Sequence, residues 1–269
     1  MLQHLTCALV QMNSGDNWKQ NLDDATSAIH RAIRRGASLI VLPENVLCFG
    51  ASAIDSFAPH VDDCIAQLQA LSDDFDVFLI CGSVPVRSSD DAKRYRSRSY
   101  FLSPGAKPIS YDKVHLFDVD VSDGVGAYRE SDTYEAGDQP VLVDVLGRKL
   151  GLSICYDLRF PELYQEYQRK GVELISVPAA FTYTTGKAHW EILLRARAIE
   201  TQSFILAANQ CGTHGGNRET WGHSMIVAPD GNILSSCGAE PGLCVADLDF
   251  NLLRQVRTAM PLSTHKRLI

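Results

Sequence analysis

Segments with strand-like and helix-like patterns alternate along nearly the whole chain, and this alternation restricts the fold more than any other sequence feature. Short apolar runs of strand length occupy residues 5–12, 39–42, 76–84, 172–177 and 203–209. Amphipathic segments with helical spacing lie between them, near residues 17–35, 64–71, 161–170 and 188–202. Strands and helices in alternation are typical of layered α/β proteins. The pattern therefore predicts an α/β fold with helices on the outside of the sheets.

Two pairs of strand-like segments are too close in sequence to be joined by a helix. Residues 97–102 and 108–113 flank the turn signal Pro104-Gly105, and residues 141–145 and 149–154 flank Leu146-Gly147. Later strands are expected at 222–228, 233–236 and 243–248, before a short helix from Asn251. Hairpins within a βα pattern predict mixed sheets. Because no repeat, linker or low-complexity segment interrupts the sequence, we expect residues 1–269 to form a single domain.

The composition argues against several classes of partner. The formal net charge of −7 disfavours nucleic acid, which selects a basic surface. No stretch approaches the ~18 uninterrupted apolar residues that a membrane span needs. Residues 1–11 lack a basic leader followed by a long apolar run and a cleavage site. We therefore expect a cytoplasmic protein with neither a nucleic-acid nor a membrane partner.

The cysteines are spread along the sequence rather than grouped. The chain has eight of them, and five are scattered among apolar residues: Cys7, Cys64, Cys81, Cys211 and Cys244. Such spacing over a long chain is typical of reduced, core-filling thiols in the cytosol. Neither a CxxC pair nor an HExxH motif occurs in the sequence. We therefore expect no metal site.

Three polar side chains of different chemistry stand at the ends of strand-like runs. They are Glu44, Lys113 and Cys155. In layered α/β proteins, reactive groups and ligands collect at the carboxyl ends of strands. A thiol, a carboxylate and an ammonium can together supply a nucleophile, a base and an oxyanion partner. The three residues are therefore candidates for one catalytic site.

This pattern alone leaves the base that would serve the thiol open. A free cysteine also packs well in a core, and a loop carboxylate or lysine is often only a solvated charge. A cysteine paired with a histidine is the main competing arrangement. The candidate histidines are His115, His189 and His223.

The same three segments resemble the signature blocks of the nitrilase superfamily, the carbon–nitrogen hydrolases. Residues 42–45 (LPEN) are similar to its glutamate block, and residues 111–117 (YDKVHLF) to its lysine block. Residues 154–162 (ICYDLRFPE) are similar to its cysteine block, which is highly specific. The order and spacing of the blocks also match, and the similarity covers nearly the whole chain.

This resemblance implies a fold, an assembly and a set of site residues. The implied fold is a four-layer α-β-β-α sandwich, and the implied assembly is a homodimer that pairs through helices near the active site, with residues 251–269 in the contact. Glu44, Lys113 and Cys155 are implied to form a catalytic triad, with Glu130 as a second glutamate between lysine and cysteine in the sequence. The thiolate would attack an amide and form a thioester, and the reaction needs no metal or organic cofactor.

The C-terminal third resembles one branch of this superfamily. Residues 188–202 are similar to the branch that includes ω-amidases and deaminated glutathione amidases, and residues 207–212 and 221–225 are closer to the latter. This similarity implies hydrolysis of deaminated glutathione to 2-oxoglutarate and Cys-Gly. An ω-amidase acting on α-ketoglutaramate, or another small-amide hydrolase, is the alternative. A non-catalytic binding protein of the same fold is a third possibility.

Four residues are candidates for substrate binding: Tyr156, Arg159, Phe181 and Arg218. The backbone N–H of Tyr156 is a candidate oxyanion donor. Arg159 either binds a substrate carboxylate or locks Asp157 and its loop. Arg218 belongs to a loop at residues 210–221 whose three glycines allow a close approach to a ligand. Arg218 either pairs with the glycyl carboxylate of a departing dipeptide or is a solvated charge on an exposed flexible loop.

Overall fold

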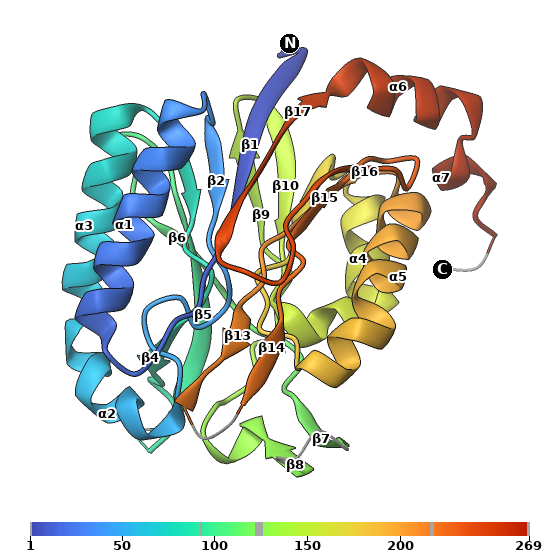
Figure 1. Cartoon of the computed structure of the whole chain (residues 1–269). Coiled ribbons are helices and arrows are strands. Elements are labelled where there is room, and N and C mark those ends of the chain that lie inside the picture. Colours follow the sequence, from blue (N-terminus) through green and yellow to red (C-terminus); the bar gives the residue numbers. More distant parts are fainter. Residues whose placement is uncertain (1, 92, 122–125, 216–217, 268–269) are drawn as a thin grey trace.

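The structure, a computed structural model, describes residues 2–91, 93–121, 126–215 and 218–267. In this part of the chain, two β-sheets lie face to face between two layers of helices (Figure 1). Helices α1 (Trp18–Arg34) and α3 (Val61–Phe75) cover one sheet, and α4 (Pro161–Arg169) and α5 (Tyr183–Thr201) cover the other. The predicted α-β-β-α sandwich with mixed sheets is therefore confirmed.

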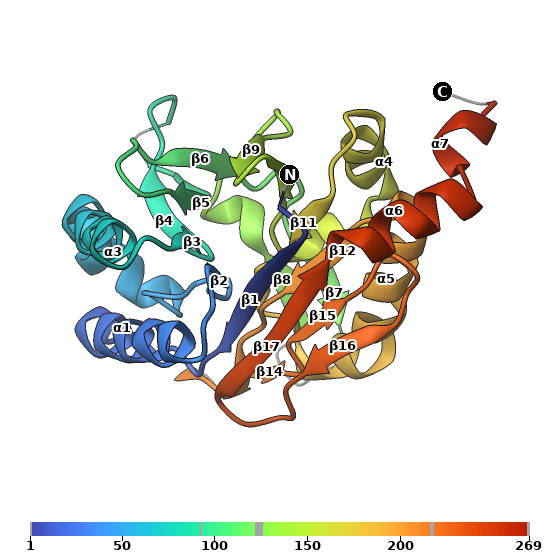
Figure 2. The same cartoon turned by 90° about the horizontal axis from the view of Figure 1, so that it is seen from above.

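The first sheet joins both ends of the chain. Within the described residues it has seven strands in the order β17-β1-β2-β3-β5-β4, with β6 paired to β5. The strands are β1 (His4–Gln11), β2 (Leu39–Val41), β3 (Phe78–Ile80), β4 (Val84–Arg87), β5 (Tyr95–Leu102), β6 (Ile109–Asp112) and β17 (Gly242–Asp249). Figure 2 shows β1 beside β17, with which it pairs in antiparallel register.

The second sheet is built from the middle of the chain. Over the described ranges it has six strands in the order β16-β15-β12-β11-β10-β9. They are β9 (Leu142–Val145), β10 (Arg148–Leu152), β11 (Leu174–Ser176), β12 (Phe204–Ala207), β15 (Met225–Val227) and β16 (Ile233–Ser236). The parallel core β10-β11-β12 and the antiparallel hairpin β9-β10 both occur, as the sequence pattern predicts.

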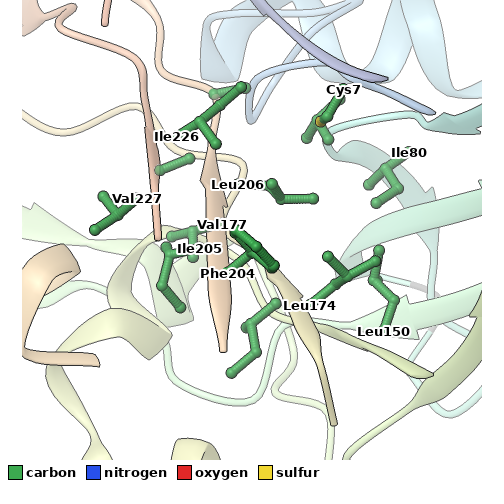
Figure 3. Close-up of a cluster of buried hydrophobic side chains, with 14 of the residues drawn as sticks. Cys7, Ile80, Leu150, Leu174, Val177, Phe204, Ile205, Leu206, Ile226 and Val227 are labelled. Atoms are coloured by element: carbon green, nitrogen blue, oxygen red, sulfur yellow. The ribbon is translucent and has the colours of Figure 1, made fainter. Parts of the chain in front are cut away.

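The alternation of side chains along each strand creates two cores. In β1, Cys7 and Leu9 lie in the core between the sheets, whereas Ala8 and Val10 lie in the core beneath α1. This division follows from the two-residue period of a strand. Figure 3 shows the core between the sheets, where Cys7 and Ile80 of the first sheet approach side chains of the second.

Local signals in the sequence explain where the helices begin. Asn17 caps α1 by accepting a hydrogen bond from the backbone N–H of Gln20. Thr182 caps α5 in the same way, accepting from the N–H of Thr185, so α5 begins five residues earlier than its apolar pattern indicates. The remaining helices are short: α2 (Ile54–Phe57), α6 (Phe250–Ala259) and α7 (Leu262–His265).

The predicted strand over residues 76–84 is wrong in one respect, because it is broken into β3 and β4. The break lies at Gly82, whose φ is +51°. A Cβ atom at this position would stand 1.8 Å from the carbonyl oxygen of Pro43. Only glycine permits such an approach. The break therefore lets the chain pass close to the segment that carries Glu44.

Two hairpins were not predicted, and both lie at the same end of the molecule in Figure 1. The first pairs β7 (Asp118–Val121) with β8 (Gly126–Arg129). The second pairs β13 (Cys211–Thr213) with β14 (Glu219–Trp221). The expectation of a flexible loop over residues 210–221 is therefore wrong for the residues in these two strands, because backbone pairing orders them.

Two further sequence expectations concern the membrane and the cysteines. In the described ranges, no helix combines the length and the apolar character that crossing a bilayer requires. None of the eight cysteines, all of which lie in described residues, forms a disulfide, and seven of them are buried. The prediction that the five scattered cysteines fill the core is confirmed, because Cys7, Cys64, Cys81, Cys211 and Cys244 are all buried.

Candidate active site

The structure brings together the three side chains that the sequence places at strand ends. Glu44 follows β2, Lys113 follows β6, and Cys155 begins a 3₁₀ turn (Cys155–Arg159) shortly after β10. The Nζ atom of Lys113 donates to Oε1 of Glu44 over 2.8 Å, and both side chains are at most 5% exposed. The cysteine comes from the second sheet and the other two residues from the first, so the site lies where the two sheets meet.

Glu130 completes the surroundings of the lysine. It lies in a 3₁₀ turn (Glu130–Asp132) directly after the β7–β8 hairpin. Lys113 Nζ lies 2.9 Å from each of its carboxylate oxygens. The backbone N–H of Phe117 also donates to Glu130 Oε2 over 2.6 Å. Glu130 is therefore held by two partners, and together with Glu44 it fixes the position of the Lys113 ammonium.

Cys155 has an unusual backbone conformation. Its φ is +47°, in the left-handed region that non-glycine residues rarely adopt. Its N–H donates to the carbonyl oxygen of Pro178 over 2.8 Å, which fixes the turn against the chain after β11. The negative charge of the Glu44 carboxylate acts on its side chain. A residue held in a sparsely populated conformation beside a carboxylate is a pattern that clusters at active sites.

Burial and then the charge of Glu44 favour the protonated form of the Cys155 thiol at rest. Burial, and then the negative charge of Glu44, raise the pKa of Cys155 well above its ordinary value, although the Lys113 ammonium opposes this. Burial also works to lower the pKa of Lys113, but Glu130 and Glu44 outweigh it and hold that pKa well above its usual range. The resting site is thus a neutral thiol beside an ammonium and two glutamates.

These side chains open into a cavity of about 260 Å³. Its lining includes all eight residues that the sequence nominates for the site: Glu44, Lys113, Glu130, Cys155, Tyr156, Arg159, Phe181 and Arg218. The described residues contain no group of three or more histidine, cysteine, aspartate or glutamate side chains arranged to hold a metal ion.

Arg159 lies over the wall of this cavity rather than on Asp157. Its guanidinium is 5.2 Å from the ring centre of Phe181, and its Nη1 lies 3.2 Å from Nδ1 of His189. The Asp157 carboxylate has other partners, described below. The expectation that Arg159 locks Asp157 is therefore wrong, and its position in the cavity lining favours a role in binding.

Arg218 lines the cavity and contacts two aromatic rings. Its guanidinium carbon is 4.8 Å from the ring centre of Phe49 and 5.3 Å from that of Tyr128. Its Nε atom is buried and has no hydrogen-bond partner among the described residues. The two rings were missed by the sequence reasoning, although Phe49 and Tyr128 are close in sequence to Glu44 and Glu130.

The histidines proposed as alternative bases are engaged elsewhere. None of the three is among the described residues that line the cavity. His115 stacks on Phe160 and contacts Asp157 through Nδ1, His189 contacts Arg159, and His223 stacks on Trp221. This arrangement favours Glu44 over a histidine as the group that takes the thiol proton.

Comparison with known proteins places this geometry in a family. The sequence profile of the carbon–nitrogen hydrolase family matches residues 6–258. The chain is 40% identical to a deaminated glutathione amidase of Yersinia enterocolitica, over 100% of this chain and 95% of that protein. It is 34% identical to a chloroplastic omega-amidase of Arabidopsis thaliana, over 99% of this chain and 73% of that protein.

A solved structure agrees with these relatives. The C. elegans NitFhit protein superposes with a TM-score of 0.92 at 33% identity, and the match covers 98% of this chain. The present chain spans 65% of the NitFhit chain, so the similarity concerns only part of that protein. A profile match over residues 6–258, full-length relatives and a shared fold lead to one conclusion. This chain belongs to the carbon–nitrogen hydrolase family.

Proposed function

We propose that this protein is an amidase that hydrolyses deaminated glutathione to 2-oxoglutarate and Cys-Gly through a thioester on Cys155. The observation that carries the proposal is that Cys155 and Glu44 line the same cavity, where Glu44 forms an ion pair with the Lys113 ammonium and its negative charge acts on the thiol. A thiol activated by an adjacent base is the arrangement that nucleophilic catalysis requires. Relatives named deaminated glutathione amidase support the choice of substrate.

The chemistry begins with proton transfer. Glu44 accepts the thiol proton as the sulfur attacks the amide carbonyl, and the positive charge of Lys113 favours the thiolate. The oxyanion is held by Lys113 Nζ and the backbone N–H of Tyr156, each such donor typically contributing about 2.7–4 kcal/mol. Protonated Glu44 then gives its proton to the leaving nitrogen as the C–N bond breaks, which leaves an acyl group on Cys155.

Water completes the cycle. Glu44, again a carboxylate, takes a proton from a water molecule whose oxygen attacks the thioester carbonyl. The C–S bond breaks, the acid product leaves, and the proton on Glu44 returns to the sulfur. Glu130 stays in contact with Lys113 throughout and keeps the ammonium directed at the reacting carbonyl. These steps use no metal ion and no organic cofactor.

The substrate preference follows from charge. In the described part of the cavity lining, Arg159 and Arg218 are guanidiniums that form no salt bridge with a carboxylate. Deaminated glutathione has two carboxylates, one on the 2-oxo acyl half and one on the glycyl end. We assign the first to Arg159, beside Phe181, and the second to Arg218.

The ω-amidase alternative differs only in the leaving group. The amide α-ketoglutaramate has the same acyl half but releases ammonia, so it brings one carboxylate instead of two. Similarity to a relative named omega-amidase supports hydrolysis of α-ketoglutaramate as the second candidate function. A non-catalytic binding role is disfavoured by the intact set of Glu44, Lys113 and Cys155.

The direct test measures kcat/KM for purified protein on both α-keto amides, together with the variant Cys155→Ala. We expect the higher kcat/KM on deaminated glutathione and no turnover by the folded variant, because the thiol is the only proposed nucleophile. A preference for α-ketoglutaramate would favour the ω-amidase. Substantial turnover by Cys155→Ala would refute the mechanism on either substrate.

The assembly and cellular location are also proposals. We propose that residues 1–269 act as one cytoplasmic domain and form a homodimer through α5 and the tail 251–269. On α5, Ile192 is 70% exposed and Ile199 is 48% exposed, and Met260 in the tail is 59% exposed. Leu253, by contrast, is buried against its own core and is not available to a partner. Light scattering at micromolar concentration should give the mass of a dimer, and a monomer would contradict this.

A further inference from the structure

One buried carboxylate, that of Asp157, connects the segment of Lys113 to the segment of Cys155. The side chain is fully buried. Its Oδ2 accepts from the Tyr111 hydroxyl over 2.7 Å and from the Ile154 N–H over 2.8 Å. Its Oδ1 accepts from the backbone N–H of His115 over 3.0 Å and from His115 Nδ1 over 2.8 Å. Each oxygen therefore has two donors.

The donors surround the two reactive side chains in sequence. Tyr111 and His115 are two residues before and two residues after Lys113. Ile154 directly precedes Cys155, and Asp157 follows it by two residues. The Asp157 carboxylate thus binds the residues on either side of Lys113 and the residue that precedes Cys155.

This contact matters because the lysine and the thiol belong to different sheets. The N–H of Lys113 donates to Ser97 of β5 in the first sheet, over 3.0 Å. The N–H of Cys155 donates to Pro178, which follows β11 in the second sheet. A small slide of one sheet against the other would change the separation between ammonium and sulfur. Asp157 opposes that slide at the point where it would affect the site.

We propose that Asp157 is a positioning residue that sets the placement of the Lys113 ammonium relative to the Cys155 sulfur. It acts through the two segments and touches neither the substrate nor the reacting atoms. The inference rests on the proposed function, since it takes Cys155 as the nucleophile and Lys113 as its cationic partner. Burial keeps Tyr111 a hydroxyl donor, because burial and then the charge of Asp157 raise the pKa of Tyr111 well above its ordinary value.

The test uses Asp157→Asn in the full chain. An amide has one acceptor oxygen, so its NH₂ group must face one of the two donor pairs and push that segment away. We expect kcat to fall about 100-fold with KM nearly unchanged, since a displacement near 1 Å can cost this much. Glu173→Gln is the matched control. It replaces a carboxylate by an amide in the largely buried ion pair with Arg148, which lies at the end of β10 away from Cys155. The control should lose stability but keep its kcat.

A second readout separates positioning from general damage. The alkylation rate of Cys155 by iodoacetamide at neutral pH reports the ease of thiolate formation without any substrate. Asp157→Asn should slow this reaction about tenfold when Lys113 is present, and far less in a Lys113→Ala background, because the two residues act through one path. An equal slowing in both backgrounds would overturn the proposal, as would an unchanged kcat in folded Asp157→Asn.

Tyr111→Phe keeps the inference testable if Asp157→Asn fails to fold. This variant removes one donor and leaves the carboxylate and its other three contacts in place. We expect a lower kcat with an unchanged KM, and an unchanged kcat in the folded variant would count against the proposal. Failure of the proposed function would look different, because Cys155→Ala would then remain active whatever the Asp157 variants do.

Discussion

Removing the guanidinium of Arg218 should change substrate preference more than it changes catalysis. In Arg218→Ala the contact proposed for the glycyl carboxylate is lost, while Cys155, Glu44 and Lys113 keep their surroundings. A hydrogen bond between charged groups contributes about 1.5–3 kcal/mol. Taking about 2 kcal/mol, the loss in kcat/KM on deaminated glutathione is about 30-fold, since about 1.4 kcal/mol corresponds to a factor of ten.

The surroundings of Arg218 explain why its contact with the carboxylate should contribute more binding free energy than a contact of a solvated surface arginine. Arg218 contacts the rings of Phe49 and Tyr128, and its Nε is buried. Ordering of the side chain therefore precedes substrate binding, which lowers the entropic cost of the contact. Turnover of α-ketoglutaramate, which has no glycyl end, should stay within about twofold of the wild type on the same reasoning.

The assay compares steady-state kcat/KM on both amides for the wild type, Arg218→Ala and Arg218→Lys. Arg218→Lys keeps a positive charge but loses the planar fork, so its kcat/KM on deaminated glutathione should fall between the other two. An equal loss on both substrates in Arg218→Ala would show that the residue supports the fold rather than the leaving group, and the argument from charge would be refuted.

Two further predictions concern the ammonium and a buried histidine. Lys113→Ala should lose far more kcat than an alanine variant of His115, His189 or His223, because in the proposed mechanism Lys113 holds the developing oxyanion and no histidine does. A histidine variant as inactive as Cys155→Ala would instead favour a Cys-His mechanism. His214 is buried and stacked on Phe49, and burial lowers its pKa to about 4 from 6.5. Between pH 4 and pH 6.5, His214 is therefore protonated in the unfolded chain and neutral in the folded chain. The free energy of unfolding should consequently fall by about 3 kcal/mol as the pH drops from 6.5 to 4. Urea unfolding at several pH values should show a weaker pH dependence in His214→Gln than in the wild type, and identical pH dependence in both would contradict this.

The sequence allowed the three strand-end residues to be predicted for a physical reason. Glu44 and Cys155 each follow an apolar strand-like run, and Lys113 follows the more polar strand-like segment 108–112. A polar side chain at such a strand end is either solvated or functional. Glu130 has no such signal, because it follows a short hairpin without an apolar pattern. Only resemblance to a family pointed to it.

Long-range features of the fold were beyond the reach of local patterns. The pairing of β1 with β17 joins residues at opposite ends of the chain, and no periodicity in either strand specifies that partner. The hairpins β7–β8 and β13–β14 are short and polar, so they resemble loops in the sequence. Asp157 likewise looks like a polar turn residue, and its burial arises only from the meeting of the two sheets.

The central claim is that Cys155 becomes acylated during amide hydrolysis. The most direct measurement is intact-protein and peptide mass spectrometry after rapid acid quenching of the wild-type enzyme during turnover of deaminated glutathione. We predict that the mass of the α-ketoglutaryl group appears on the peptide that contains Cys155 and is absent from Cys155→Ala. An adduct on a different cysteine, or an active Cys155→Ala enzyme, would contradict the account.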